Sequence, residues 1–401
     1  MKTVSGGVTA PLGFLAAGVY CGIKKKKQLD LALLVSEQEG PIAGVFTTNR
    51  VVAAPVVLDR IHLKKGVGRA ILVNSGNANA CTGPEGMRSA KNMAKLVATA
   101  LPSAPHTIFI GSTGVIGQPL PIACIENAVP TLLARVNRRG GREAAQAILT
   151  TDLKPKQMAV RARLGERMVT VGGMAKGSGM IHPNMATMLA YLTTDAVIDR
   201  RVLQKVLRQA VDQSFNCITV DGDTSTNDTV LCLANGMAEN KPLQPGSADF
   251  MRFCAMVETV CRTLALKICW DGEGVTKVVR IEVRGAKTTR SAKQVAQTIA
   301  TSNLVKTALF GGDANWGRVM AAVGRAGVAI DPSRISLQFG DVPMVRQGQG
   351  LGQAAERQLT KVFRSREFTI LVDLKQGMAG AHMWTTDLSY EYIRINASYR
   401  S

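Results

Sequence analysis

Short apolar segments that end in Gly, Asn or Ser recur along the first part of this 401-residue chain. Their length and composition are typical of buried strands. The four segments of this kind are Leu31–Val35, Ala43–Thr47, Ala70–Val73 and Thr107–Ile110. Apolar residues at helical spacing alternate with these segments, at Ser89–Ala100 before the last of them and at Ile122–Val136 after it. This alternation predicts the α/β class, with helices and sheets stacked in a layered sandwich.

The Gly-rich segment Gly172–Gly179 separates this part from a second α/β region. Further elements are expected as helices at Arg200–Phe215, Ser291–Val305 and Gly352–Phe363, and as strands at Ile335–Phe339 and Glu367–Asp373. The C-terminal segment Tyr390–Ser401 is predicted to be a strand with a short tail. Near the start, Val8–Tyr20 contains Pro11 and follows a single lysine, so it is interpreted as a first strand and turn rather than a signal peptide.

The formal net charge is +20, from 49 Lys and Arg against 29 Asp and Glu, so a nucleic-acid partner has to be considered. The basic residues are scattered, and aromatic residues that could stack on bases are only 4% of the chain. The run Lys24–Lys27 is the one dense patch, and such runs are usually solvated turns. We therefore expect no nucleic acid as partner, although a positive field could attract small anionic substrates.

Cysteine and histidine usage argues against a zinc site. The chain has eight cysteines and four histidines, and no two cysteines form a CxxC pair. Cys254 and Cys261 are seven residues apart, which places them on one face of a helix as buried thiols. Reduced cysteines are typical of a cytoplasmic protein. No apolar stretch reaches the length of a membrane span.

Most common catalytic motifs are missing from the sequence. It has no GxxxxGK[ST] phosphate loop, no HExxH and no GxSxG. The segment Asp221–Asp228, DGDTSTND, begins like a calcium loop. It has Thr226 where the loop needs Gly and Cys232 where it needs Glu, which favours an Asx-rich turn over a metal site.

Four clusters of Gly with small hydroxyl or amide residues remain. They are Asn74–Gly83, Gly111–Gly117, Lys176–Leu189 and Gly311–Gly317. By composition each could be a turn. A strand that ends in Gly-Ser-Thr-Gly also presents backbone N–H groups, as an oxyanion site requires.

In this order, the clusters resemble the glutamate N-acetyltransferase / ornithine acetyltransferase family of arginine biosynthesis. KGSGMIHPNMATML and GGDANWGRV are long and specific matches, and the resemblance runs from GVTAPLGFLAAGV near the start to INASYRS at the end. It implies a fold like that of DmpA-type aminopeptidases and ornithine acetyltransferases, of the N-terminal-nucleophile type. It also implies that no metal or organic cofactor is needed.

The resemblance implies self-cleavage between Ala186 and Thr187, giving an α chain of residues 1–186 and a β chain of residues 187–401. Elementary chemistry agrees, because a threonine hydroxyl is a poor nucleophile without a base. Once Thr187 is N-terminal, its own α-amino group, with a reference pKa of about 7.7–8.0, lies beside the hydroxyl. Without the resemblance, Thr187 would be interpreted as a core or capping threonine.

The family's oxyanion pair matches Thr113 and Gly114, whose hydroxyl and N–H would donate to the developing negative charge. The family's TTD motif matches Thr150–Asp152, with Thr150 as the substrate contact. The same tripeptide recurs at Thr193–Asp195 and Thr385–Asp387, so only its position before the Gly-rich segment selects Thr150.

The remaining substrate contacts also come from the resemblance. Lys176 matches a lysine eleven residues before the nucleophile and could pair with a substrate carboxylate. Glu273 could hold the ammonium group of the substrate. Asn396 and Ser401 match the last two contacts, although the family often ends in Thr where this chain has Ser401.

The implied activity is ping-pong transfer of an acetyl group from N-acetylornithine to glutamate, through an acetyl-threonine enzyme. Some family members also use acetyl-CoA as donor, and the sequence leaves open whether this chain does. The implied assembly is a heterotetramer of two α and two β chains. The alternatives are an aminopeptidase or amidase, in which water replaces glutamate, and a basic nucleic-acid-binding protein.

Overall fold

The computed structural model describes residues 1–182 and 188–398, in which helices and strands alternate as the α/β prediction requires. These residues divide into two compact units. Unit 1 holds residues 1–216 and 223–268, and unit 2 holds residues 217–222 and 269–398.

Unit 1 is built on nine strands. They are β1 (Lys2–Thr3), β2 (Phe14–Val19), β3 (Leu31–Phe46), β4 (Val67–Asn77), β5 (Ile108–Val115), β6 (Lys156–Leu164), β7 (Arg167–Lys176), β8 (Leu189–Thr194) and β9 (Thr229–Ala234). The order across the sheet is β1-β6-β7-β8-β9-β3-β4-β5, with β2 paired to β3. Strands β4 and β5 run parallel, as do β8 and β9.

The long strand β3 joins two halves of this sheet. Its first part pairs with β2 and β4, and Ile42–Phe46 pairs with β9. Apolar side chains of both halves share one core, among them Phe109 of β5 and Tyr191 of β8. The halves therefore pack face to face.

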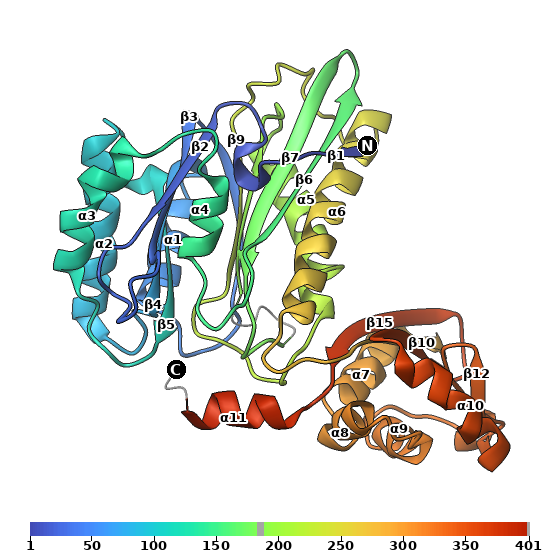
Figure 1. Cartoon of the computed structure of the whole chain (residues 1–401). Coiled ribbons are helices and arrows are strands. Elements are labelled where there is room, and N and C mark those ends of the chain that lie inside the picture. The colour runs from blue at the N-terminus through green and yellow to red at the C-terminus, as the bar shows by residue number, and fades with distance from the viewer. Residues whose placement is uncertain (183–187, 399–401) are drawn as a thin grey trace. The chain divides into compact units, whose positions relative to one another are not determined.

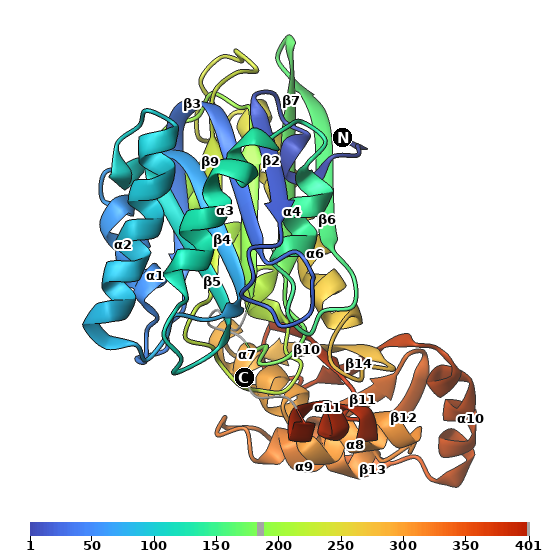
Figure 2. The same cartoon turned by 60° about the vertical axis from the view of Figure 1, so that its left-hand side comes forward.

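The helices of unit 1 are α1 (Ala54–Leu63), α2 (Gly83–Ala100), α3 (Ile122–Ala134), α4 (Gly141–Ala147), α5 (Arg200–Asp212) and α6 (Ala248–Trp270). Helices α1 to α3 cover the β2–β5 half, and α5 and α6 cover the other half (Figures 1 and 2). Helix α5 starts at Asp199, whose carboxylate accepts the N–H groups of Arg201 and Val202. The result is the predicted layered sandwich.

Unit 2 carries a six-stranded sheet in the order β13-β12-β11-β14-β10-β15. Its strands are β10 (Val278–Ala286), β11 (Ser336–Phe339), β12 (Val342–Arg346), β13 (Gln349–Gly350), β14 (Glu367–Asp373) and β15 (Ala379–Thr386). Its helices are α7 (Thr289–Ala300), α8 (Asn303–Gly311), α9 (Trp316–Gly324), α10 (Gln353–Arg364) and α11 (Tyr390–Ser398). Helices α7 to α10 contribute to a single core with the sheet.

The Gly-rich segment Gly172–Gly179, predicted as a break, is largely strand, because its residues up to Lys176 belong to β7 and pair with β8. Three of the predicted helices and strands also differ in the structure. The two strands expected within Leu31–Thr47 are one strand, because β3 pairs with β4 on both sides of its exposed acidic middle. The helix expected at Ser291–Val305 is two helices, because Ser302 has an extended backbone between α7 and α8. Both helices still pack into the same core.

The third difference is the C-terminus, where the expected strand is the helix α11. Tyr390–Ser401 was expected to begin as a strand, but α11 buries none of its described residues, so no sheet position selects that conformation. Local contacts favour the helix instead. Ser389 Oγ accepts the N–H of Tyr392, and Glu391 pairs with Arg394 one turn on.

Within the described ranges, no helix combines the length and the apolar character needed to cross a membrane.

Candidate active site

Thr113 lies near the end of β5 in unit 1, and its side chain is buried. Its neighbour Gly114 has a φ of 134°, and a Cβ atom there would come 2.3 Å from the backbone carbon of Gly76. Gly76 is the register partner of Gly114 on β4. Only glycine allows this approach, which fixes the shape of the backbone at the predicted oxyanion pair.

Lys176 is the last residue of β7 and is only 2% exposed. Its Nζ donates to Thr113 Oγ1 over 3.4 Å. The structure thus brings together two residues that the sequence analysis selected 63 positions apart. Because the ammonium group donates to the hydroxyl oxygen, the hydroxyl hydrogen of Thr113 stays available for another acceptor.

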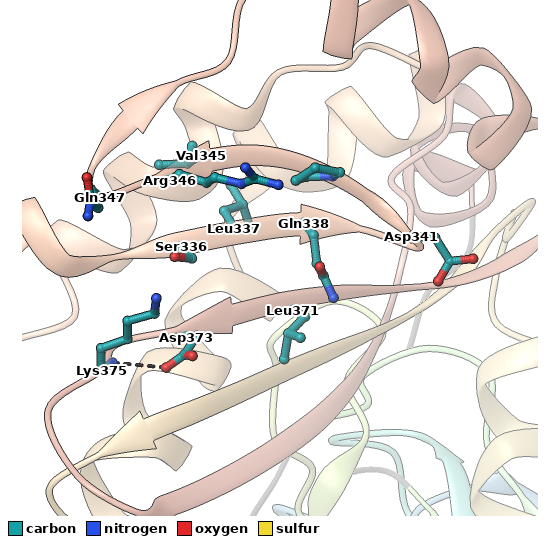
Figure 3. Close-up of a pocket in the computed structure, with 11 residues that line it drawn as sticks. Ser336, Leu337, Gln338, Asp341, Val345, Arg346, Gln347, Leu371, Asp373 and Lys375 are labelled. Carbon is teal, nitrogen blue, oxygen red and sulfur yellow. Dashed lines mark hydrogen bonds between the residues drawn. The ribbon is translucent and has the colours of Figure 1, made fainter.

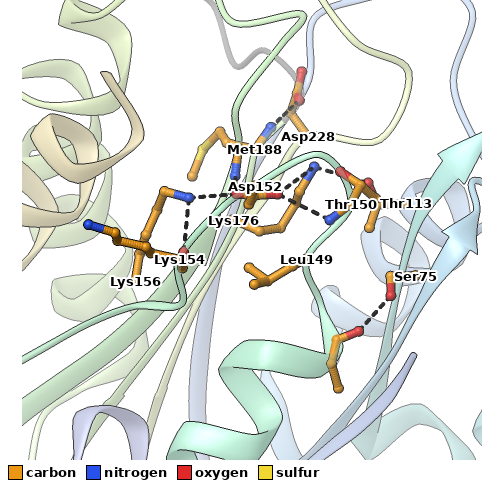
Figure 4. Close-up of polar contacts among 12 residues, drawn as sticks. Ser75, Thr113, Leu149, Thr150, Asp152, Lys154, Lys156, Lys176, Met188 and Asp228 are labelled. Atoms are coloured by element: carbon orange, nitrogen blue, oxygen red, sulfur yellow. Dashed lines mark hydrogen bonds and ion pairs between the residues drawn. The ribbon is translucent and has the colours of Figure 1, made fainter. Parts of the chain in front are cut away.

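Asp152 joins this pair and was not selected from the sequence (Figure 4). Its carboxylate exposes no side-chain surface and lies 2.6 Å from Lys156 Nζ and 3.9 Å from Lys176 Nζ. Burial by itself raises the Asp152 pKa, but the two ammonium groups and the Gly177 N–H outweigh it and hold the pKa at about 2. Asp152 is therefore ionised and balances part of the buried positive charge.

Thr150 lies two residues before Asp152, in the connection between α4 and β6, and its N–H donates to Asp152 Oδ2 over 3.1 Å. The end of α4 is fixed in turn to β4, since Ser75 Oγ donates to Ala147 O over 2.6 Å. Thr113, Thr150 and Lys176 come from three separate elements, and hydrogen bonds and ion pairs connect them through Asp152.

Asp228 is a second functional candidate that the sequence analysis missed. It is fully buried, and its Oδ1 accepts the N–H of Met188 over 2.9 Å. Met188 directly follows Thr187 in the chain, so Asp228 holds the peptide group next to the predicted nucleophile. Burial raises the Asp228 pKa well above its usual range, although the Met188 N–H and the Thr47 side chain oppose that shift.

The segment Asp221–Asp228, interpreted above as an Asx-rich turn, passes from unit 2 back into unit 1. Asp221 accepts a hydrogen bond from the Tyr392 hydroxyl within unit 2, whereas Asp228 holds Met188 within unit 1. Within residues 1–182 and 188–398, no group of three or more His, Cys, Asp or Glu side chains is placed to hold a metal ion.

The other predicted contacts lie in unit 2. Glu273 is 8% exposed, and its Oε2 accepts a hydrogen bond of 2.8 Å from Asn396 Nδ2 on α11. A Cβ atom at Gly274 would come 2.5 Å from the Tyr392 backbone nitrogen, so α11 packs directly against the Glu273 turn. The helical form of the C-terminus is what places Asn396 on Glu273.

Ala186, Thr187 and Ser401 lie outside the described residues. His182 and Met188 are the described residues nearest in sequence to the Ala186–Thr187 bond, one on each side of it.

A separate hollow of about 720 Å³ lies on the sheet of unit 2, over β11, β12 and β14 (Figure 3). Its lining mixes both charges, with Arg346 and Lys375 against Asp341 and Asp373. No predicted site residue that the structure describes lines it, so its position does not identify the active site.

Comparison with known proteins extends over the whole chain. The profile of the ArgJ family matches residues 15–401. The arginine biosynthesis bifunctional protein ArgJ of Symbiobacterium thermophilum is 49% identical over 403 residues, and the match covers 100% of both chains. The protein of the same name from Geobacter sulfurreducens is 48% identical, with 97% of this chain and 99% of the relative covered.

Among solved structures, the arginine biosynthesis bifunctional protein argJ from Bacillus halodurans is similar, with a TM-score of 0.50 and 41% sequence identity. The match covers 98% of that chain but only 52% of this one, so the solved polypeptide is about half as long.

Proposed function

Since this chain belongs to the ArgJ family, we propose that it transfers the acetyl group of N2-acetyl-L-ornithine to L-glutamate in arginine biosynthesis. The transfer proceeds through an acetyl ester on the Thr187 hydroxyl. The observation that carries the proposal is the buried Lys176 ammonium group, 3.4 Å from the Thr113 hydroxyl and next to the Asp152 carboxylate. This arrangement supports the proposal, because acyl transfer requires donors that stabilise a tetrahedral oxyanion.

In the first half-reaction, Thr187 Oγ attacks the acetyl carbonyl of N-acetylornithine, and the α-amino group of Thr187 takes the hydroxyl proton. The C–N bond breaks, the proton passes to the leaving nitrogen, and ornithine departs. In the second, the amino group of glutamate attacks the ester, and N-acetylglutamate leaves as Thr187 Oγ regains its proton. The α-amino group has a reference pKa of about 7.7–8.0, which suits proton transfer near neutral pH.

Thr113 Oγ and the Gly114 N–H are the proposed oxyanion donors. The contact from Lys176 supports this role in two ways. It orients the Thr113 hydroxyl by occupying the oxygen lone pair, and it places a positive charge near the developing negative charge. Thr150 and Lys176 are proposed substrate contacts, and Lys176 is the one that would pair with a substrate carboxylate. Glu273 is the proposed contact for the substrate ammonium group, and Asn396 and Ser401 are the last two proposed substrate contacts.

We further propose that the Ala186–Thr187 bond is cut to give chains of residues 1–186 and 187–401. Two observations support this. Asp228 fixes the N–H of Met188, directly after the proposed nucleophile. The similar solved chain is also about half as long as this one, as a processed chain would be. An uncut bond leaves Thr187 without its α-amino base, so the precursor is inactive.

Acetyl-CoA is proposed as a second donor, which the word bifunctional in the names of the relatives supports. We also propose an assembly of two α and two β chains in the cytoplasm. Free thiols at all eight cysteines are in keeping with a reducing compartment. Size-exclusion chromatography with light scattering tests the assembly, with twice the mass of one uncut chain expected.

A denaturing gel and a transfer assay test the main proposal. The wild-type protein is expected to show two bands with the masses of residues 1–186 and 187–401, and Thr187→Ala a single band. Thr360→Ala, at an exposed threonine, is the matched control and is expected to be cut. A Thr187→Ala protein that still splits would sink the self-cleavage proposal.

In the transfer assay, steady consumption of N-acetylornithine is expected only when glutamate is present. Steady hydrolysis of N-acetylornithine at the same rate with and without glutamate would instead identify an amidase.

A further inference from the structure

The basic run Lys24–Lys27, interpreted from the sequence as a solvated turn, occupies a defined place in unit 1. It lies in the connection between β2 and β3, and we name it the tetralysine loop. The buried Asp30 carboxylate holds the start of this connection by accepting three backbone N–H groups. These come from Cys21 at 2.6 Å, Ile23 at 2.9 Å and Lys24 at 3.0 Å.

Lys24 attaches the loop to the candidate active site. Its Nζ donates to Leu29 O over 3.0 Å and to Leu149 O over 2.7 Å. Leu149 directly precedes Thr150, the proposed substrate contact. Burial lowers the Lys24 pKa, and the Lys176 charge lowers it further, whereas the Asp30 and Asp152 carboxylates oppose the shift.

The loop also packs against the strand next to the proposed oxyanion pair. A Cβ atom at Gly76 would come 3.2 Å from Lys24 Cγ and 3.0 Å from Ile23 Cγ2. Gly76 is the register partner of Gly114. The tetralysine loop therefore begins one strand away from the acyl-transfer centre.

Lys25, Lys26 and Lys27 differ from Lys24 because their side chains are exposed. Within the described part of the chain, their side chains take part in no hydrogen bond or ion pair. The nearby carboxylates bind other groups. Asp30 accepts backbone N–H groups, and Asp152 pairs with Lys156 and accepts the N–H of Gly177. Three exposed positive charges thus follow Lys24, whose side chain is bonded beside the candidate site, and their shared field attracts anions.

We propose that Lys25, Lys26 and Lys27 bind the phosphate groups of a phosphorylated acyl thioester, acetyl-CoA, and so serve the second donor. This inference rests on the proposed function. N-acetylornithine has one carboxylate and gains little from three extra charges, whereas CoA carries a diphosphate and a third phosphate on a long flexible arm. Lysine is a common phosphate ligand because it acts as a mobile point charge.

The test compares two triple variants of the full chain with equal loss of charge. The site variant is Lys25→Gln/Lys26→Gln/Lys27→Gln, which keeps Lys24 and its anchoring bonds. The control is Lys64→Gln/Lys65→Gln/Lys95→Gln, at exposed lysines before β4 and on α2. For each protein, KM is measured with acetyl-CoA and with N-acetylornithine as donor at low and high salt. Binding of free CoA is measured separately by calorimetry.

In the site variant, the KM for acetyl-CoA and the Kd for CoA are expected to rise about tenfold, as three partly screened ion pairs would give. The KM for N-acetylornithine is expected to stay within about twofold of wild type, and the salt dependence of the acetyl-CoA KM is expected to weaken. The control variant is expected to match wild type with both donors.

An equal rise in both variants would assign the effect to overall charge and overturn the inference. So would an unchanged Kd for CoA in the site variant, or a wild-type protein that binds no CoA while it uses N-acetylornithine. If wild type binds CoA through the loop but transfers no acetyl group from either donor, the proposed function fails and the anion site stands.

Discussion

Three copies of the tripeptide TTD show what a residue can and cannot reveal before its surroundings are known. In each copy, the aspartate carboxylate accepts hydrogen bonds from two backbone N–H groups, some close to it in sequence and some far from it. Asp152 takes those of Thr150 and Gly177, Asp195 those of Leu12 and Thr170, and Asp387 those of Thr276 and Lys277. Only Asp152 also lies against two buried lysines.

The residues predicted from the family resemblance therefore differ from those found in the structure in the information needed to select them. Lys176 could be selected because it lies in a long and specific motif, and Thr113 because it matches the family's oxyanion pair. Asp152 and Asp228 could not, since their roles depend on partners that only the folded chain brings close. The spacing of Asp152 and Lys156, four residues apart, was the single local signal, and it is too common to select a site.

Replacing Asp152 by Asn should lower the free energy of unfolding by roughly 3 kcal/mol at pH 7, because two buried ammonium groups lose their counter-charge. Urea unfolding at several pH values measures this. The matched control is Asp341→Asn, at an exposed carboxylate, with little change expected.

The sign of the pH dependence follows from the lowered pKa. The folded pKa of Asp152 is about 2, below the unfolded value of about 3.9. Its contribution is therefore complete above about pH 4 and is lost as the pH falls towards 2. A difference between wild type and Asp152→Asn that grew on going from pH 7 to pH 3 would contradict this account.

Thr113→Val should lower kcat by about 100- to 1,000-fold with a small change in KM, because the lost hydroxyl donates mainly in the transition state. Rates are normalised to the amount of cut protein on a gel, so that slower cleavage is not mistaken for slower transfer. Thr113→Ser keeps a hydroxyl at the same place and should retain most of the rate. Wild-type kcat in the valine variant would exclude Thr113 as an oxyanion donor.

At the level of elements, buried strands and amphipathic helices were predictable where packing selects them. β14, Glu367–Asp373, has the bounds expected from its alternating apolar residues. The prediction was wrong for α11, whose described residues are not buried, so packing in a sheet does not select a strand there. It was also wrong for the middle of β3, where pairing with β4 stops after Val35 and resumes at Gly40, beyond the exposed acidic residues.

The close approach of β4 and β5 gives an element-scale prediction. Gly114→Ala places a Cβ atom 2.3 Å from the Gly76 backbone, so the two strands must separate. Gly117→Ala is the matched control, because Gly117 also has a positive φ of 77° but nothing within 4 Å. Thermal unfolding should show Gly114→Ala less stable than Gly117→Ala by about 2 kcal/mol, with transfer activity lost only in the former. Equal stability of the two variants would mean that the strands are not held in close contact.

For the whole molecule, the two compact units and the two proposed chains do not coincide. Along the chain, the proposed cut lies inside unit 1, between β7 and β8. The chain makes its last passage from unit 1 into unit 2 after residue 268. Composition and periodicity could not predict the unit boundary, because α6 runs through it without a change of pattern. Strands β8 and β9 belong to the second chain, yet they lie between β7 and β3 of the first.

The two chains are therefore expected to remain together after cleavage. Native size-exclusion chromatography should give one peak that contains both bands, and urea at concentrations that unfold unit 1 should be needed to separate them. A cleaved protein whose chains elute apart in native buffer would contradict the interleaved sheet.

The interleaving of β7, β8, β9 and β3 also bears on how such an enzyme can be made. A first chain released alone would lack the two middle strands of its sheet, and a second chain alone would have no neighbours for them. Synthesis as one polypeptide supplies both partners in a one-to-one ratio, at the same moment and in the correct order along the sheet. The covalent link is then required for assembly and dispensable for the finished catalyst, so the two parts should be difficult to exchange between finished molecules.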